Sequence, residues 1–170
     1  KGINDTGGLV GVNSNGSTIA NSYAEGNVSG SLRTGGLAGA NRDSDVTHSY
    51  AIGSVEGVYD AGGLIGLIHN GTVSFSFATG KVSGSEDVGG LVGIQEDALL
   101  TYSYASGDVA ACGDAGGLVG DNDESLISNS FATGNVICLP EGSGDSIGGL
   151  VGDNSHGDIE FSFSTGRVSI

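Results

Sequence analysis

The carboxylates that follow two of the glycine-rich strings are the side chains whose type and spacing best suit ligand binding. Asp121, Asp123 and Glu124 follow one such string, and Asp153 occupies the position of Asp121 after the next string. If the two strings lie in adjacent layers, these oxygens approach one another, and hard cations such as Ca²⁺ take clustered oxygen ligands. The four residues are therefore candidate calcium ligands. The sequence contains neither the EF-hand spacing nor the Gly-Gly-x-Gly-x-Asp calcium repeat, so a solvated acidic edge is the alternative interpretation.

Catalytic groups do not form a recognisable set in this sequence. His48, His69 and His156 lie at unrelated positions of the repeat described below, so they are not expected to meet on adjacent layers. The sequence has no Gly-x-Ser-x-Gly nucleophile elbow and no glycine-rich string followed by the Lys-Ser/Thr of a phosphate loop. We therefore expect a protein without enzymatic activity.

The two cysteines offer more specific chemistry. Cys112 follows Val109 by three residues, and Cys138 follows Val136 by two, and these valines are equivalent positions of successive repeats. The spacing therefore predicts a disulfide between neighbouring layers rather than two reduced thiols. Such a bond would staple the irregular connection 139–146 and would indicate an oxidising compartment.

The string Gly-Gly-Leu-x-Gly organises the whole chain. It begins at residues 7, 35, 62, 89, 116 and 148, so the steps are 28, 27, 27, 27 and 32 residues. A fixed period in this range is typical of stacked-repeat proteins, which form one quasi-linear domain. We therefore expect one repeat domain over residues 1–170. Because Lys1 enters in the middle of the pattern, we interpret the chain as a segment of a longer protein.

The second half of each repeat has the alternation of a β-strand. Ile19 and Tyr23 share one parity and Ala20, Ser22 and Ala24 the other, and no window shows helical periodicity. About 27 residues suit one turn of a solenoid, so we predict an all-β fold, a parallel β-solenoid of six coils.

Stacking of the coils then predicts three interior ladders. The first consists of the leucines of Gly-Gly-Leu, which we call the frame leucines: Leu9, Leu37, Leu64, Leu91, Leu118 and Leu150. The second consists of the six aromatic residues Tyr23, Tyr50, Phe77, Tyr104, Phe131 and Phe163, and the third of the valines that close each repeat, Val28, Val55, Val82, Val109, Val136 and Val168. The opposite parity predicts a flat outer face of small side chains, a candidate binding face formed by Thr47, Ser49, Ser74, Ser76, Thr101, Ser103, Ser128 and Ser130. The residue after each frame leucine is also apolar, so either a corner lies there or an outward apolar row offers a lateral contact.

The repeats resemble the GLUG-motif family, named for glycine, leucine, any residue and glycine, as in Gly8-Leu9-Val10-Gly11 and its five copies. Repeats of this family occur in large bacterial surface and secreted proteins, including adhesins and some immunoglobulin-A-cleaving metalloproteases. The resemblance implies an extracellular or cell-surface setting. The protease chemistry is not implied, because the sequence has no His-Glu-x-x-His.

Charge narrows the choice of partners. The formal net charge is −15, which disfavours nucleic acid and anionic lipid, and no apolar run is long enough for a membrane helix. We expect a structural or adhesive segment that contacts neighbouring repeats or other copies of itself, end to end or laterally. The alternatives are a module that binds glycans or ice through the flat face, and an accessory region of a secreted protease.

Overall fold

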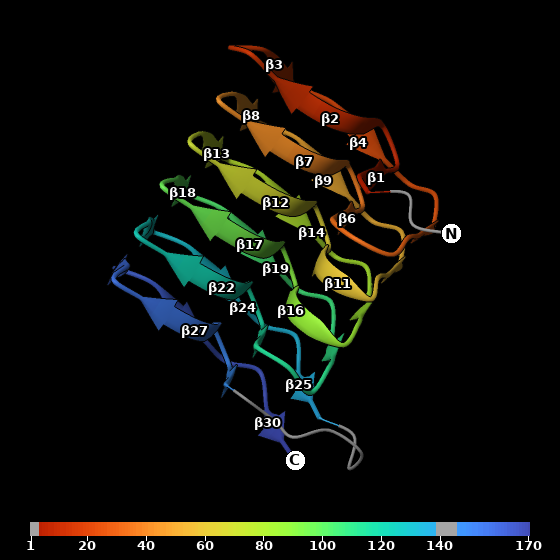
Figure 1. Cartoon of the computed structure of the whole chain (residues 1–170). Helices are drawn as coiled ribbons and strands as arrows, with labels where there is room; N and C mark the ends of the chain where they lie inside the picture. Colours follow the sequence, from red (N-terminus) through yellow and green to blue (C-terminus); the bar gives the residue numbers. More distant parts are fainter. Residues whose placement is uncertain (1–3, 139–145) are drawn as a thin grey trace.

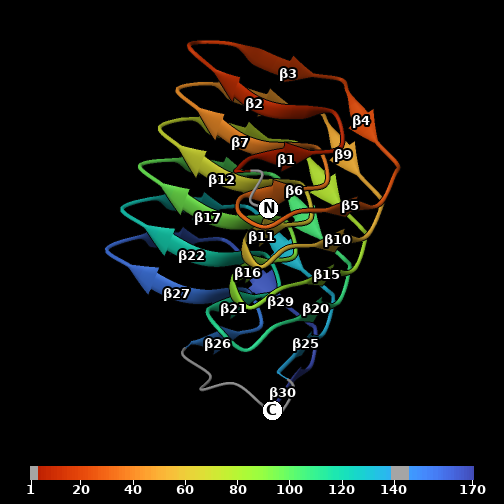
Figure 2. The same cartoon turned by 45° about the vertical axis from the view of Figure 1, so that its right-hand side comes forward.

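Each repeat folds into five short strands separated by corners, and the repeats stack into a parallel β-solenoid. The computed structural model describes residues 4–138 and 146–170. Equivalent strands of successive coils pair in parallel, in register, to form five continuous sheets (Figure 1). Figure 2 shows the coils lying one above another from the N-terminal to the C-terminal end. The all-β solenoid expected from the sequence is confirmed.

The first sheet contains β1 (Thr6–Gly7), β6 (Thr34–Gly35), β11 (Tyr59–Gly62), β16 (Glu86–Gly89), β21 (Ala115–Gly116) and β26 (Ile147–Gly148). The second contains β2 (Val10–Ser14), β7 (Ala38–Arg42), β12 (Ile65–His69), β17 (Val92–Glu96), β22 (Val119–Asp123) and β27 (Val151–Ser155). The third contains β3 (Thr18–Ala20), β8 (Asp45–Thr47), β13 (Thr72–Ser74), β18 (Leu99–Thr101), β23 (Leu126–Ser128) and β28 (Asp158–Glu160).

The fourth sheet contains β4 (Tyr23–Ala24), β9 (Tyr50–Ala51), β14 (Phe77–Ala78), β19 (Tyr104–Ala105), β24 (Phe131–Ala132) and β29 (Phe163–Ser164). The fifth contains β5 (Val28–Ser29), β10 (Val55–Glu56), β15 (Val82–Ser83), β20 (Val109–Ala110), β25 (Val136–Ile137) and β30 (Val168–Ser169). Each sheet therefore has six layers, which we number as coils 1 to 6. Six layers span about five turns, so the expected count of six is slightly high as a number of turns.

The leucine and valine ladders fill the interior as the sequence predicts. Leu37, Leu64, Leu91 and Leu118 have no exposed surface, and Val55, Val82, Val109 and Val136 are equally buried. The residue after the leucine is buried too in coils 2 to 5 and partly buried in coils 1 and 6, because the chain turns a corner there. Leu64 and Ile65 both donate their backbone N–H to the carbonyl of Leu91, so two consecutive side chains face inward. The corner alternative is therefore the correct one.

The repeated glycines allow close packing between backbones. A Cβ on Gly66 would lie 2.6 Å from the carbonyl carbon of Arg33 in the preceding coil. A Cβ on Gly63 would lie 2.9 Å from the Cβ of Ala78, which crosses the core from the fourth sheet. The second glycine of Gly-Gly-Leu and the alanine that begins the inner side of the fourth sheet in coils 1 to 5 are thus small for the same reason. Within the described residues the frame glycines have no positive φ, so close approach explains them.

The prediction that the six aromatic residues are interior is wrong. Tyr23 and Phe163 are more than half exposed and the others are half-buried, whereas the adjacent alanines Ala51, Ala78 and Ala105 are buried. The reason is a corner residue with left-handed backbone, such as Phe75 with φ 49°, placed between the third and fourth sheets. This residue interrupts the alternation, so parity reverses across it. Val73 points inward, Ser76 also points inward, and Phe77 points outward.

Within residues 4–138 and 146–170, no helix is long and apolar enough to cross a membrane.

Candidate interaction surfaces

The predicted flat binding face does not exist in the form expected. Ser49, Ser76, Ser103 and Ser130 are only 1% exposed, because the parity reversal turns them inward. Each hydroxyl has a structural role. Ser76 Oγ donates to the carbonyl oxygen of Ser74 at 2.8 Å and accepts from the backbone N–H of Ser49 in the preceding coil at 3.2 Å. The serines therefore satisfy the backbone groups that the corner leaves without partners.

The other four members of that face lie on the outer side of the third sheet. Thr47, Ser74 and Thr101 are half-buried and Ser128 is buried. Their hydroxyls bond to one another between coils, from Ser74 to Thr47 at 3.1 Å and between Thr101 and Ser128 at 2.9 Å. These hydroxyls are largely engaged within the protein, so they do not form an open lattice for glycan or ice.

An unbroken column of rings covers the outer side of the fourth sheet. We call it the long aromatic ladder, and it consists of Tyr23, Tyr50, Phe77, Tyr104, Phe131 and Phe163. Neighbouring rings are nearly parallel, with interplanar angles of 4–6° and centroids 4.9–5.3 Å apart. Because ring faces contact one another along the ladder, solvent meets mainly ring edges.

A second column of rings occupies the corner before the long ladder. We call it the short aromatic ladder, and it stacks His48, Phe75 and Tyr102 at 5.0 Å centroid spacing. Asn129 and Phe161 hold the same corner position in coils 5 and 6, and all five residues have positive φ near 50°. Phe75 and Tyr102 are about half exposed, and Phe161 is 84% exposed. Together the two ladders form an exposed apolar stripe, which is the usual mark of a contact surface.

A column of side-chain amides runs through the second sheet, and its members are buried except in coil 6. We call it the amide ladder, and its members are Asn13, Asn41, Gln95, Asn122 and Asn154. Three of the amides donate to the next coil, from Asn13 to Asn41 at 2.7 Å, from Gln95 to Asn122 at 2.6 Å and from Asn122 to Asn154 at 2.5 Å. Asn41 donates instead to the carbonyl of Ser44 in its own coil, at 2.6 Å. Ile68 interrupts the ladder, so Gln95 Oε1 is buried without a partner. Sequence reasoning missed this ladder, although asparagine or glutamine recurs at one phase of the repeat.

Carboxylates crowd the junction between the first and second sheets. We call Asp60, Asp87, Asp114 and Asp121 the acidic row. Burial, reinforced by the charges of Asp60, Asp121 and Asp114, raises the pKa of Asp87 to about 7. Burial and then Asp153 and Asp114 raise the pKa of Asp121 to about 6. Burial also raises the pKa of Asp60, although the nearby Arg33 opposes the shift. The row therefore holds like charges in a partly desolvated setting.

The four candidate calcium ligands are not brought together as one set. Asp121 and Asp153 are paired in register, and Asp121 Oδ1 is buried without a hydrogen-bond partner. Asp123 lies further along β22, with His156 Nδ1 3.9 Å from its Oδ1, and Glu124 sits exposed at the next corner. Across the described parts of the chain, no three His, Cys, Asp or Glu side chains converge as metal ligands.

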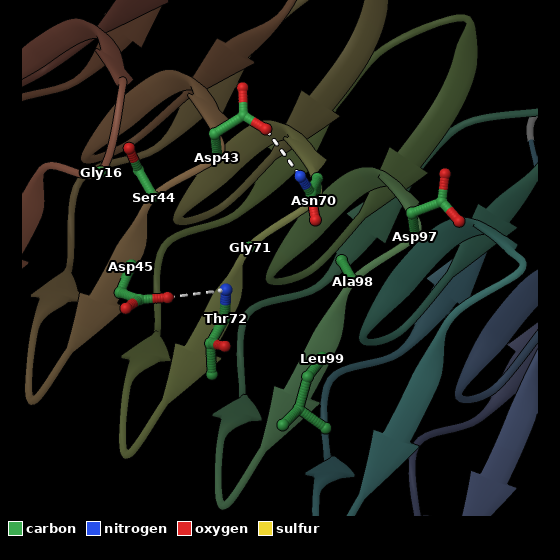
Figure 3. A pocket seen from close by; sticks show the side chains of 10 residues that line it. All are labelled: Gly16, Asp43, Ser44, Asp45, Asn70, Gly71, Thr72, Asp97, Ala98 and Leu99. Carbon is green, nitrogen blue, oxygen red and sulfur yellow. Dashed lines mark hydrogen bonds between the residues drawn. The ribbon is translucent and has the colours of Figure 1, made fainter.

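A hollow lies along the corner between the second and third sheets (Figure 3). Asn70 Nδ2 donates to Asp43 Oδ1 at 2.6 Å, and the backbone N–H of Thr72 donates to Asp45 Oδ1 at 3.1 Å. Gly71 lines this hollow between Ser44 of the preceding coil and Ala98 of the next, which hold the equivalent positions. These two bonds link neighbouring coils along the floor of the hollow and engage one oxygen each of Asp43 and Asp45 within the protein.

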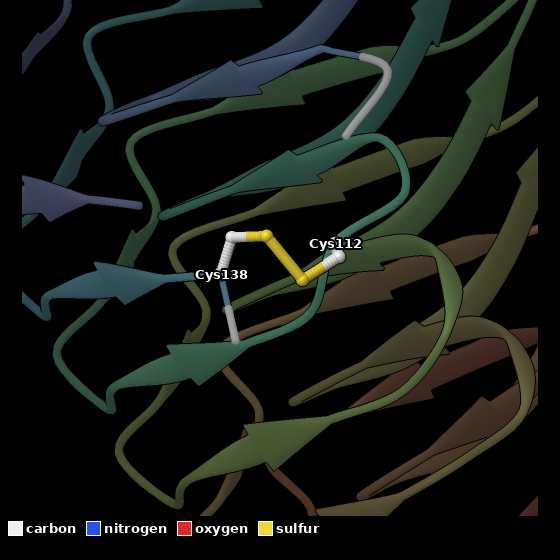
Figure 4. The surroundings of a disulfide bond; sticks show 2 residues. All are labelled: Cys112 and Cys138. Carbon is white, nitrogen blue, oxygen red and sulfur yellow. A yellow bond between two sulfur atoms is a disulfide. The ribbon is translucent and has the colours of Figure 1, made fainter. Parts of the chain in front are cut away.

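The two cysteines form a disulfide (Figure 4). Their Cα atoms are 4.7 Å apart, and the bond joins the residues that follow β20 and β25 in coils 4 and 5. The expected relation of this bond to the connection after Cys138 concerns residues 139–145, which lie outside the described residues. A structural disulfide is typical of proteins that fold in oxidising compartments, and so indicates a non-cytoplasmic location.

The five continuous parallel sheets and the side-chain ladders place this chain in the class of repeat β-solenoids. Comparison with known families places the GLUG motif at two positions of the chain, residues 2–29 and 84–110, each about one coil in length. The matched family is a repeat motif and indicates no catalytic domain. No curated protein and no solved structure matches the chain.

Proposed function

We propose that this chain is a non-catalytic structural segment of a bacterial surface or secreted protein, acting as a stalk and as a surface for association with further coils. The observation that supports this most directly is the continuity of the five in-register sheets from coil 1 to coil 6. Stability in such an array comes from interfaces between neighbouring coils, which suits a rod that bears load or carries other parts outward. The disulfide and the GLUG motif favour an extracellular setting.

The end coils are suited to receive another coil of the same kind. Strands β1 to β5 and β26 to β30 each pair on one side only within the described chain. In coil 1, Leu9 is 49% exposed, whereas Leu37 directly behind it is fully buried. At the other end, Val168 and Phe163 have lost the cover that their ladders provide elsewhere. Unpaired strand edges with matching apolar ladders are templates for strand addition.

The amide ladder favours head-to-tail contact, because it ends in a donor in coil 6 and in an acceptor in coil 1. Asn122 donates to Asn154 at 2.5 Å, and Asn154 Nδ2 then donates only to the carbonyl of Gly157, at 2.9 Å, among the described groups. Asn13 donates to Asn41 and to the carbonyl of Asp45, which leaves its Oδ1 as an acceptor. Asn154 of one copy therefore complements Asn13 of a second copy, with all five sheets continued in parallel.

Sedimentation velocity across a wide range of concentrations tests the proposal. We expect the wild-type chain to associate into elongated species whose frictional ratio rises with size. Asn154→Asp removes the donor and places a charge at the joint, so it should weaken association. The matched control is Ser106→Asp, which adds the same charge at an exposed position in coil 4, away from both ends. A wild-type chain that stays monomeric at all concentrations, or an equal effect of both substitutions, would contradict end-to-end association.

A further inference from the structure

The short aromatic ladder is broken at a single coil. Tyr102, Asn129 and Phe161 occupy the same corner in coils 4, 5 and 6. The backbone aligns them, because Tyr102 N–H donates to the carbonyl of Ser128 at 3.2 Å and Asn129 N–H donates to that of Glu160 at 3.1 Å. Their φ angles are 47°, 49° and 49°. Asn129 therefore stands where every other coil from 2 to 6 has a ring.

The break has the dimensions of one planar group. Phe75 and Tyr102, which are adjacent in the same ladder, have ring centroids 5.0 Å apart. Two coil steps therefore separate the Tyr102 and Phe161 rings by about 10 Å, twice the spacing of neighbouring strands. Elsewhere in this ladder, a single ring stands midway between two rings that are two coils apart. Both rings are largely uncovered, at 55% and 84% exposure, and the exposed Asn129 amide lies between them.

The surroundings of the break favour a cation over a neutral or anionic group. Strand β28 is exposed along its length and carries Asp158 and Glu160, the latter directly before Phe161. The chain as a whole has a formal net charge of −15. A guanidinium group is planar, permanently charged and weakly hydrated, and it stacks on aromatic faces more readily than an ammonium group does.

We propose that the break between Tyr102 and Phe161 binds the guanidinium group of an arginine from a basic partner segment. The guanidinium lies between the two ring faces, donates to Asn129 Oδ1 and faces the carboxylate of Glu160. This site is lateral and goes beyond the end-to-end association proposed above. Neither depends on the other, since the arginine would use the space between coils 4 and 6 of one chain, whereas a second copy would stack beyond coil 6.

The test uses a capped single-arginine peptide, acetyl-Gly-Arg-Gly-amide, titrated into the full chain and followed by NMR. The arginine side-chain protons should move upfield, because they lie over two ring faces. The lysine analogue should bind roughly fivefold more weakly, the factor expected when stacking on a ring face is lost. Methyl glucoside serves as the neutral probe and should leave the Asn129 and Tyr102 resonances unchanged.

Two substitutions locate the site without disturbing the core. Phe161→Ala removes one face of the sandwich, and Asn129→Phe fills the break with a ring in a backbone conformation that Phe75 already adopts. Each should abolish the upfield shift, whereas Phe75→Ala, inside the ladder, should retain it. Circular dichroism establishes that all three variants keep the β-fold. Equal binding of the arginine and lysine peptides, wild-type binding by Asn129→Phe, or a response to methyl glucoside at these residues would overturn the proposal.

Discussion

The protonation of Asp87 provides a quantitative test of how the coils stack. Asp87 lies in the acidic row between Asp60 and Asp114, and burial followed by these neighbouring charges raises its pKa from 3.8 to about 7. In the folded chain the carboxyl group therefore holds its proton more tightly than in the unfolded chain. By linkage, this group's contribution favours folding fully below about pH 4 and is lost as pH rises through about 7.

The substitution Asp87→Asn removes the charge and keeps the shape of the side chain. At 1.36 kcal/mol per pKa unit, a shift from 3.8 to about 7 sets an upper limit of about 4 kcal/mol. Since Asp87 is half-buried, solvent screening reduces this to about 1–2 kcal/mol. Asparagine also tolerates the left-handed backbone at this position, where φ is 52°. The variant should be more stable than wild type at pH 8 and nearly equal to it at pH 4.

Urea unfolding followed by circular dichroism at pH 4, 6 and 8 measures the effect. The exposed Glu25→Gln in coil 1 is the matched control, because it removes one negative charge far from the acidic row. Its effect should be small and should vary little between these pH values. If Asp87→Asn gives the same stability difference at pH 4 and pH 8, or destabilises at pH 8, the reasoning about the acidic row is refuted.

Three further substitutions test the ladders and the disulfide by urea unfolding. Leu91→Ala, at a site without exposed surface, should cost about 3 kcal/mol, and a cost below about 1 kcal/mol would contradict its place in the core. Phe77→Ala removes two stacked contacts at 4.9 Å on the outer surface and should cost about 2 kcal/mol; a loss as large as that of a buried aromatic residue would argue against the outward orientation. Replacing Cys112 and Cys138 together by serine should cost about 3 kcal/mol for a sequence separation of 26, and intact-mass measurement of the wild type should show two protons fewer than after reduction.

Much of the architecture could be predicted from the sequence, because a solenoid imposes the same requirement on every repeat. Leu37 and Leu64 are buried because each packs against the equivalent leucine of the next coil. The repeated Gly-Gly-Leu-x-Gly string therefore indicates both the length of a coil and the stacking of the coils. The alanines and glycines that meet across the core are also visible as invariant small residues of the repeat. The disulfide followed from the phases of its two cysteines.

The orientation of the fourth sheet could not be predicted in the same way. Strand alternation from Ile19 places Tyr23 inside, and the corner at Asn21 reverses it. Asn21 and Asn129 are residue types that favour a left-handed backbone, but Phe75, Tyr102 and Phe161 hold the same conformation without that signal. The serine after each corner was the signal of the reversal that the sequence offered. Its buried hydroxyl donates to a backbone carbonyl before the corner, as Ser76 does to Ser74.

The coil as the unit of folding is the central claim, and deletion of one coil tests it most directly. Removing residues 59–85 takes out β11 to β15 and joins coil 2 to coil 4, since Tyr59 and Glu86 are equivalent positions. The remaining coils should restack, so the shortened chain should keep its β circular dichroism and cooperative unfolding, and its length in X-ray scattering should fall by about 4.8 Å. Removing only residues 59–71 breaks the register and should abolish the fold. If the whole-coil deletion unfolds the chain as completely as the half-coil deletion does, the account is wrong.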